Sequence, residues 1–294
     1  MKHYDIGIGW THPADQIFVK LLKKHLRNQK RSFLELTFEN LEEDFLRIQK
    51  SELSFDAFIC QSLEDHPAYP IISYILKQRG TKIFPDPDSV IAFGSKAKLH
   101  ALFEKEQLPL PPTAILSQKN PPEKEYGAFI QALGIPFVLK PAHGGGGDYV
   151  SLTGRTATDI KEAVRDNAPD HTLMQKLLAP ATLGNRIAWF RPIFVQGLII
   201  PLWWDPRNHF YKEFGNTKQE KEIATKLIFF VERIAKLTKL HLFSIEVMVD
   251  TKGKYTIIDY LNHPIDLNTQ DRTPDALPAG IVEAVAAKLA QSIA

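Results

Sequence analysis

Cysteine is almost absent from this chain of 294 residues: Cys60 is the only one, so no disulfide can form within the chain. It lies in the apolar run DAFICQS, which predicts a buried, small hydrophobic side chain. No apolar run approaches the roughly 18–20 residues that a membrane-spanning helix needs. The first ten residues, MKHYDIGIGW, also lack the pattern of a signal peptide. We therefore expect a cytoplasmic protein with no membrane partner.

An excess of one charge is also lacking, since 36 Lys and Arg stand against 34 Asp and Glu and the net charge is +2. Such a balance creates no field that would recruit nucleic acid. The 44% of hydrophobic residues exclude a disordered chain. The length suffices for two domains or one elaborated α/β unit. The sequence leaves the oligomeric state open, a homodimer included.

Strand and helix signals alternate over residues 1–85, starting with the strand YDIGIG and an amphipathic helix over residues 13–27. Such alternation predicts a small parallel sheet with right-handed crossovers. The stretch PDPDS, residues 85–89, then interrupts the pattern and predicts a linker. The first 85 residues are therefore expected to form a Rossmann-like α/β domain.

Mixed signals that indicate an α+β fold follow the linker. They include a helix over residues 95–106, the strands PFVLK and TLMQKLL, and two strands within residues 187–204, IAWFRPIFV and LIIPLWW. A long helix over about residues 218–240 leads to the strands FSIEVMV and YTIIDYL, joined by the turn DTKGK. In LIIPLWW, alternation predicts one of Trp203 and Trp204 in the core and the other on a substrate-side wall.

Four consecutive glycines, Gly144, Gly145, Gly146 and Gly147, follow a strand that ends at Lys140. Because each glycine costs conformational entropy on ordering, the run needs a reason. A flexible surface loop is one interpretation. The other is a phosphate site, in which backbone N–H groups approach the anion and Lys140 supplies a positive charge. The glycines follow the lysine, so the run is not a Walker P-loop.

Two acidic residues lie inside otherwise apolar strands near the C-terminus, Glu246 and Asp259. If the strands pair through the turn at Gly253, the two carboxylates come close together and repel each other unless a cation lies between them. Oxygen ligands suit Mg²⁺, and Asn262 adds a carbonyl oxygen. The alternative is a pair of salt-bridged acids in the core.

The order of these motifs resembles the ATP-grasp superfamily, and the resemblance covers about residues 86–294. It implies an N-terminal pre-ATP-grasp domain over residues 1–85 and a two-lobed ATP-grasp fold. The N-lobe with its glycine-rich lid would span residues 86–175 and the C-lobe residues 176–294. In this superfamily the two lobes hold ATP between them.

The resemblance also implies roles for residues of the nucleotide site. Lys96 or Lys98 matches a helix lysine that contacts phosphate, and Lys140 matches the strand lysine on the α- and β-phosphates. Gly144, Gly145, Gly146 and Gly147 match the lid loop over the triphosphate.

The strand TLMQKLL matches the segment between the lobes that binds adenine. Gln175 would contact the adenine edge, and Lys176 and Leu177 would offer backbone groups. Arg191 matches an arginine that faces phosphate or the acyl intermediate; a surface ion pair is its alternative.

Glu246, Asp259 and Asn262 match the metal positions, for Mg²⁺ or for Mn²⁺ in its place. The superfamily's third ligand lies two residues after the second, where this chain has Leu261. Asn262 would need a bulge or turn to point inward, and Asp266 is the alternative.

These roles imply a carboxylate–amine ligase. It would transfer the γ-phosphoryl group of ATP to a carboxylate, giving an acylphosphate and ADP, and an amine or a thiol would then displace phosphate. Lys140 and Arg191 would offset the developing negative charge. Two alternatives remain open: an ATP-grasp kinase acting on a hydroxyl group, and a non-catalytic ATP-binding module. The sequence identifies neither substrate.

Overall fold

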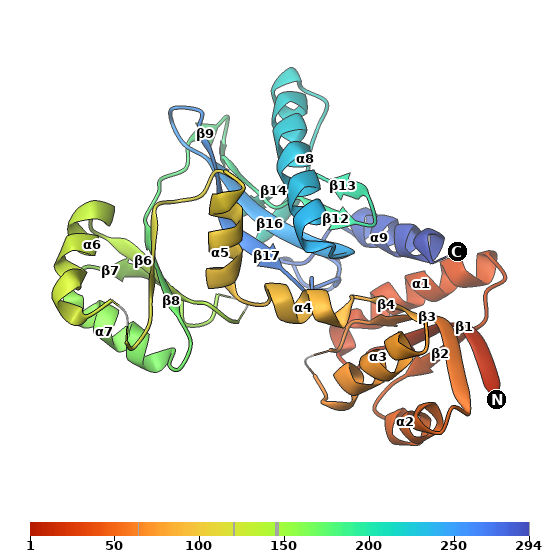
Figure 1. Ribbon diagram of the computed structural model, residues 1–294. Coiled ribbons are helices and arrows are strands. Elements are labelled where there is room, and N and C mark those ends of the chain that lie inside the picture. Colours follow the sequence, from red (N-terminus) through yellow and green to blue (C-terminus); the bar gives the residue numbers. More distant parts are fainter. Residues whose placement is uncertain (64, 120, 145–146, 294) are drawn as a thin grey trace. The chain divides into compact units, whose positions relative to one another are not determined.

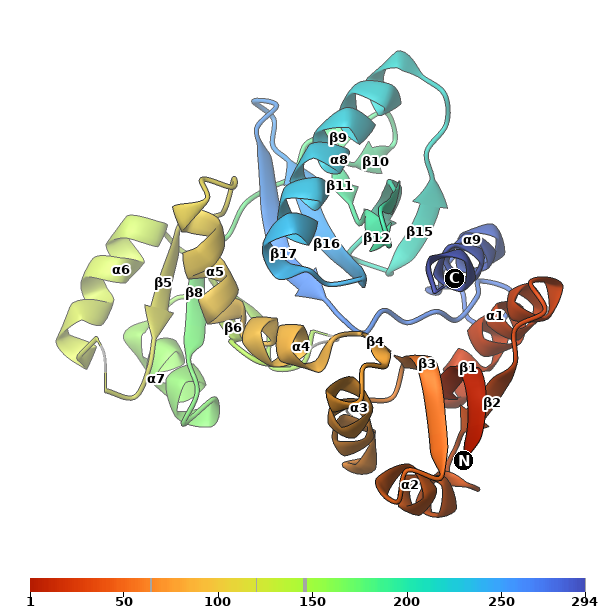
Figure 2. The ribbon, with the colours of Figure 1, turned by 45° about the vertical axis from the view of Figure 1, so that its right-hand side comes forward.

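The computed structural model describes residues 1–63, 65–119, 121–144 and 147–293 (Figures 1 and 2). Its contacts divide the chain into two compact units. Unit 1 consists of Met1–Ile91, Pro192–Ser244 and His263–Ala294, and unit 2 of Ala92–Arg191 and Ile245–Asn262. Each unit therefore combines segments that are far apart in the sequence.

Unit 1 begins with a four-stranded sheet in the order β2-β1-β3-β4, in which every neighbouring pair is parallel. The strands are β1 (Lys2–Gly9), β2 (Phe33–Leu36), β3 (Leu53–Cys60) and β4 (Lys82–Phe84). They alternate with α1 (Gln16–Asn28), α2 (Leu41–Gln49) and α3 (Ala68–Gln78). The parallel sheet predicted from the alternating signals is confirmed.

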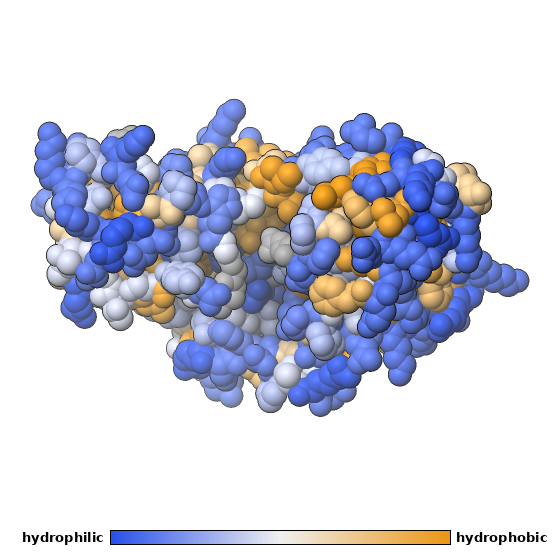
Figure 3. All heavy atoms as spheres, turned by 90° about the horizontal axis from the view of Figure 1, so that it is seen from below, coloured by the Kyte–Doolittle hydropathy of each residue, from blue (hydrophilic) through white to orange (hydrophobic). Residues whose placement is uncertain are grey.

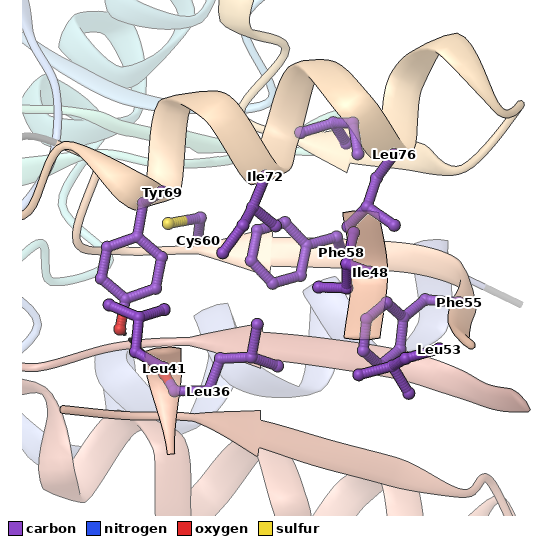
Figure 4. Packing of buried hydrophobic residues seen from close by; sticks show 11 residues of the cluster. Leu36, Leu41, Ile48, Leu53, Phe55, Phe58, Cys60, Tyr69, Ile72 and Leu76 are labelled. Carbon is purple, nitrogen blue, oxygen red and sulfur yellow. Dashed lines mark hydrogen bonds between the residues drawn. The ribbon is translucent and has the colours of Figure 1, made fainter. Parts of the chain in front are cut away.

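The core of this part lies between the sheet and the helices α2 and α3 (Figure 4). In Figure 4 the side chains of Tyr69, Ile72 and Leu76 point from α3 toward Phe58 and Cys60 on β3. Cys60 is 2% exposed, and burial raises the pKa of its thiol. It is thus the buried hydrophobic side chain that the sequence predicted.

The predicted linker PDPDS is wrong in its second half, because α4 (Pro87–Phe93) starts within it. The Oδ1 atom of Asp86 accepts a hydrogen bond from the Ser89 N–H at 3.0 Å, which satisfies one donor of the first turn. Pro87 fits the first helical position, where no N–H is needed. Proline in this stretch therefore starts a helix instead of preventing one.

The rest of unit 1 contains β12 (Ile193–Val195), β13 (Leu198–Ile200), β14 (Leu202–Asp205), β15 (Phe210–Glu213), α8 (Lys218–Thr238) and α9 (Ala279–Ser292). β12 pairs with β13 and with the first residues of β16 (Leu242–Val249), and β14 pairs with β15. Helix α8 starts with a capping box between Thr217 and Glu220.

The two strands predicted within residues 187–204 are four shorter ones: β11 (Trp189–Phe190), β12, β13 and β14. Pro192 interrupts the first prediction and Pro201 the second, because proline cannot donate a ladder hydrogen bond. Trp203 and Trp204 are 6% and 7% exposed, so the expectation that only one of them is in the core is wrong.

Unit 2 contains a four-stranded antiparallel sheet in the order β5-β8-β6-β7. Its strands are β5 (Thr113–Leu116), β6 (Phe137–Pro141), β7 (Ser151–Gly154) and β8 (Thr172–Lys176). Figures 1 and 2 show α6 (Tyr126–Leu133) and α7 (Ala157–Asp166) on one side of this sheet and α5 (Lys96–Lys105) on the other. An apolar cluster that includes Phe137, Leu139 and Met174 fills the space on the α6–α7 side.

A β-hairpin completes unit 2. The last residues of β16 pair with β11, and β16 also pairs with β17 (Tyr255–Asn262). The turn is closed by hydrogen bonds of 3.0 Å from the Asp250 N–H to the Lys254 carbonyl and from the Gly253 N–H to the Asp250 carbonyl. The predicted hairpin with Gly253 in its turn is confirmed. The short strands β9 (Thr182–Leu183) and β10 (Arg186–Ile187), which precede β11 in the sequence, pair with each other.

The structure is therefore a mixed α/β arrangement with one parallel sheet and several antiparallel ones. Figure 3 shows one face of the molecule, where hydrophilic side chains predominate and apolar ones lie between them. Within the described residues, no helix combines the length and the apolar character needed to cross a bilayer.

One carboxyl group in unit 1 is buried at a cost. Asp15 ends the short 3-10 helix η1 (Pro13–Asp15) before α1, and it is 9% exposed. Burial raises the pKa of its carboxyl to about 6; His12 opposes this shift, and the charges of Asp266 and Asp65 add to it. Folding therefore favours the protonated form of Asp15.

We expect Asp15→Asn to stabilise the protein at pH 7 but not at pH 4. Folded Asp15 binds its proton more tightly than unfolded Asp15, so its contribution to stability is complete below about pH 4 and is lost as the pH rises through about 6. Two pKa units correspond to about 3 kcal/mol at most. Urea unfolding of both proteins at the two pH values measures this, and an equal difference at both would contradict it.

Candidate functional site

Lys140 is buried on the face of the β5–β8 sheet that does not contact α6 and α7. It is 6% exposed, and its Nζ donates a hydrogen bond of 2.8 Å to the Ile258 carbonyl. The Oδ1 atom of Asp259 lies 4.0 Å from the same Nζ. Burial lowers the pKa of Lys140, and the negative charge of Asp259 opposes that shift. The strand β17 thus supplies the groups that compensate this buried ammonium.

Lys96 brings a second positive charge to the start of the glycine run. Its backbone N–H donates to the Ala142 carbonyl at 2.6 Å, and its Nζ donates to the Gly144 carbonyl. The charge of Lys96 also lowers the pKa of Lys140. Two lysines that repel each other beside a glycine run fit a polyphosphate, whose charge would relieve the repulsion.

The other predicted residues of this region are not brought together in the same way. Lys98 is exposed on α5, and no contact of its side chain with the glycine run is described. Gly144 and Gly147 have φ angles of +101° and +84°, which favour glycine. Gly145 and Gly146 lie outside the described residues.

The two predicted acids lie on the two strands of the hairpin. Glu246 on β16 is 9% exposed; its Oε2 accepts a hydrogen bond of 3.2 Å from Trp189 Nε1. Arg191 Nη1 lies 3.7 Å from Glu246 Oε1. Burial raises the pKa of Glu246 to about 7; Arg191 opposes the shift, and the charge of Asp259 adds to it. The acids are therefore close enough to repel each other.

One oxygen of Asp259 lies 4.0 Å from the Lys140 ammonium but accepts no hydrogen bond in the described structure. This oxygen, Oδ1, is buried and has no hydrogen-bond partner. A buried carboxylate oxygen without a donor is costly unless a cation compensates it. An unsatisfied oxygen beside a second carboxylate fits Mg²⁺, which usually takes one or two protein carboxylates plus phosphate oxygens and water. Among the described residues, no cluster of three or more His, Cys, Asp or Glu side chains forms a metal site.

The predicted third metal ligand, Asn262 or Asp266, stays a prediction. In Asn262, the buried Nδ2 has no hydrogen-bond partner, and the side-chain oxygen is the atom that would bind a metal ion. Asp266 belongs to unit 1, where its Oδ1 accepts a hydrogen bond of 2.9 Å from the Asn268 N–H. Of the predicted metal residues, the structure brings together Glu246 and Asp259.

The predicted adenine segment lies at the end of β8. Gln175 is 2% exposed, and its amide nitrogen donates to the hydroxyl groups of Tyr260 at 2.6 Å and Thr113 at 3.0 Å. The Lys176 N–H donates to the Pro112 carbonyl at 2.9 Å. Lys176 and Leu177 line a hollow of about 280 Å³ together with the segment from Gln131 to Pro136.

Sequence reasoning missed three residues that contact the predicted ones: Tyr260, His100 and Trp189. Tyr260 follows Asp259 directly and is fully buried, and its hydroxyl lies 2.6 Å from His100 Nδ1. A tyrosine next to a predicted metal ligand was the available signal. Nothing in the sequence indicated that Trp189 belongs to the site, because a tryptophan in a short strand is usually part of a core.

Comparisons with known proteins agree on the fold. No family model matches the sequence, and no curated protein matches it. Solved structures do match over nearly the whole chain. D-alanine–D-alanine ligase from Bacillus anthracis complexed with ATP has a TM-score of 0.67 at 15% identity, covering 99% of this chain and 96% of the ligase.

Two further structures are similar over comparable lengths. D-cycloserine synthetase DcsG has a TM-score of 0.67 at 14% identity, with 98% of this chain and 99% of the other covered. The ATP-grasp ligase PsnB complexed with a precursor peptide and AMPPNP has a TM-score of 0.63 at 14% identity, with the same coverage. The fold that the resemblance implied is thus confirmed: the chain has the fold of these solved structures, one of which is an ATP-grasp ligase.

Proposed function

We propose that this protein is an ATP- and Mg²⁺-dependent ligase that activates a carboxylate as an acylphosphate and joins it to an amine. The observation that carries the proposal is that Lys140 and Lys96 lie close to each other beside the glycine run, and that Asp259 Oδ1 lies 4.0 Å from Lys140 Nζ. Positive charges for phosphate and a carboxylate oxygen that accepts no hydrogen bond thus lie within one unit. Similar structures named as ligases or as a synthetase support the same reaction type.

The residues would act by binding and by neutralising charge. Lys140 and Lys96 would hold the phosphate chain, and Glu246 and Asp259 would hold Mg²⁺ or Mn²⁺. When bound, the metal ion supplies positive charge to the phosphate oxygens. Arg191, which lies 3.7 Å from Glu246, would offset negative charge on the acylphosphate. No protein nucleophile is required.

We also propose three domains: residues 1–85 as a Rossmann-like pre-ATP-grasp domain, 86–175 as the N-lobe and 176–294 as the C-lobe. The four-stranded parallel sheet that ends at Phe84 supports the first division. The four-stranded antiparallel sheet that ends at Lys176 supports the second.

Nucleotide binding tests the proposal first. ATP with Mg²⁺ should raise the melting temperature, because a ligand at a hundred times its Kd stabilises the folded state by about 2.7 kcal/mol. AMP is the matched control, since it keeps adenine and the α-phosphate but lacks the β- and γ-phosphates. No shift with saturating ATP would refute the nucleotide site.

The reaction is tested by pairing small carboxylates with amines and measuring ADP, followed by mass spectrometry. A ligase releases ADP and forms a product that joins the two substrates. ADP with a phosphorylated hydroxyl compound would indicate a kinase instead. Binding of ATP without ADP release from any pair would favour a non-catalytic module.

A further inference from the structure

One face of the β5–β8 sheet carries polar side chains that point away from its apolar core. Val138 on β6 pairs with Gln175 on β8, and Gln175 pairs with Thr113 on β5. Directly paired residues, and residues two apart on one strand, lie on the same face. Lys140 therefore shares a face with Gln175, opposite to the face of Met174 and Leu139, which pack in the apolar cluster. Buried polar groups on that face need partners.

Tyr260 provides the partner for Gln175. The Tyr260 hydroxyl accepts a hydrogen bond of 2.6 Å from Gln175 Nε2 and lies 2.6 Å from His100 Nδ1. Burial lowers the pKa of His100, so its ring is neutral and Nδ1 can accept the tyrosine proton. Tyr260, Gln175 and His100 are 0%, 2% and 5% exposed. The result is a buried chain of hydrogen bonds that joins β8, β17 and α5.

The ring of the same tyrosine contacts the proposed phosphate lysine. Lys140 Nζ lies 5.3 Å from the centroid of the Tyr260 ring, a cation–π distance. Lys140 also bonds to the carbonyl of Ile258, two residues before Tyr260. The strand β17 is thus attached to the sheet at two points, and Asp259 lies between them.

Asp259 depends on these attachments for its position. Its Oδ1 accepts no hydrogen bond and lies 4.0 Å from Lys140 Nζ, so the location of this carboxylate depends on the backbone of β17 and on Lys140. The second hydrogen of the Gln175 amide is already donated to Thr113. A hydrogen bond donated by the amide nitrogen to adenine would leave the buried Tyr260 hydroxyl or Thr113 without its donor, which is unfavourable.

We propose that Tyr260, held by Gln175 and His100, is a positioning residue that fixes Asp259 relative to Lys140, and that Gln175 serves this role instead of reading adenine. The inference rests on the proposed function, because it assigns Asp259 to the metal ion and Lys140 to the phosphates. It changes the role that the resemblance gave to Gln175. It also adds Tyr260 and His100 to the residues on which the site depends.

Two conservative variants test the proposal without removing bulk. Tyr260→Phe keeps the ring but removes the hydroxyl, and Gln175→Met keeps the length of the side chain but removes its donor. We expect each to raise the Mg²⁺ concentration needed for half-maximal nucleotide binding about tenfold, which corresponds to 1.4 kcal/mol. At saturating Mg²⁺, the affinity for ATP should change less than threefold. The double variant should lose about as much as either single one, because both remove the same interaction.

The matched control is Tyr74→Phe, which removes a tyrosine hydroxyl that donates to Asp88 at 3.1 Å in unit 1. It should leave the Mg²⁺ requirement unchanged. The ratio of ATP to GTP affinity should be the same in Gln175→Met as in the wild type.

Three results would overturn the inference. A changed ATP-to-GTP ratio in Gln175→Met would make Gln175 a base-reading residue. Lower melting temperatures of the folded variants with an unchanged Mg²⁺ requirement would make Tyr260 structural only. If the wild type bound no ATP at all, the proposed function itself would fail, and the inference with it. If Tyr260→Phe does not fold, Gln175→Met alone decides.

Discussion

Replacing Asp259 by Asn is expected to abolish Mg²⁺-dependent ADP formation, with a loss of at least about a hundredfold, while leaving the nucleotide-free protein nearly as stable as before. The loss follows because a neutral amide replaces one of the few anionic ligands that Mg²⁺ takes from a protein. A hundredfold loss corresponds to about 2.7 kcal/mol of transition-state stabilisation.

The stability expectation follows from the two charges that face Asp259. Its negative charge raises the pKa of Glu246, which is a repulsion, and opposes the lowered pKa of Lys140, which is an attraction. The variant loses both effects, and they act in opposite directions. Lys140 also keeps its hydrogen bond of 2.8 Å to the Ile258 carbonyl. The buried ammonium is therefore not left without an acceptor.

The competing interpretation is a structural salt bridge between Lys140 and Asp259. In that case, removing one charge from a buried pair should cost about 3–5 kcal/mol. Thermal melts of the nucleotide-free variant, measured beside turnover, separate the two. The control is Asp166→Asn, which replaces an exposed acid on α7 and should change neither the melting temperature nor the turnover rate. A large fall in melting temperature with preserved turnover in the folded fraction would refute the metal assignment.

The parts of the fold that the sequence predicted are those with local patterns. Alternation of strands and helices gave the parallel sheet of β1 to β4, and the apolar strands around Gly253 gave the β16–β17 hairpin. Local patterns failed at prolines, because a proline can either start a helix or interrupt a strand or helix. Pro87 starts α4 although it was expected to belong to a linker, and Pro192 divides a strand that was expected to be continuous.

Contacts between residues far apart in the sequence limit how much of the site the sequence can predict. The sequence predicts that Lys140 and Asp259 are important, but their separation of 4.0 Å depends on how residues 245–262 pack with residues 92–191. The same is true of Gln175, whose donors go to Tyr260 and Thr113, far from it in the chain. A glutamine has both donors and acceptors, so its residue type alone fits adenine and tyrosine equally well. Only the hydrogen-bond distances in the structure show that both donors of Gln175 go to Tyr260 and Thr113.

Removing the ammonium of Lys140 is expected to weaken ATP binding at least tenfold. A hydrogen bond to a charged group is worth roughly 1.5–3 kcal/mol, and a tenfold change in affinity is 1.4 kcal/mol. Lys140→Ala also leaves a cavity, because Lys140 is only 6% exposed. Lys140→Met retains most of the volume, and comparing the two variants separates lost charge from lost packing.

Titration calorimetry with ATP and Mg²⁺ measures the effect, with Lys105→Ala on the exposed surface of α5 as the control. Lys140→Met should lose nearly as much affinity as Lys140→Ala, because the phosphates respond to charge and not to volume. Its melting temperature should exceed that of Lys140→Ala, because the methionine side chain fills most of the volume that alanine leaves empty. ATP affinity within twofold of the wild type in folded Lys140→Met would remove Lys140 from the nucleotide site. Lys96 would then be the remaining candidate for the phosphate contact, since its Nζ already donates to the Gly144 carbonyl at the glycine run.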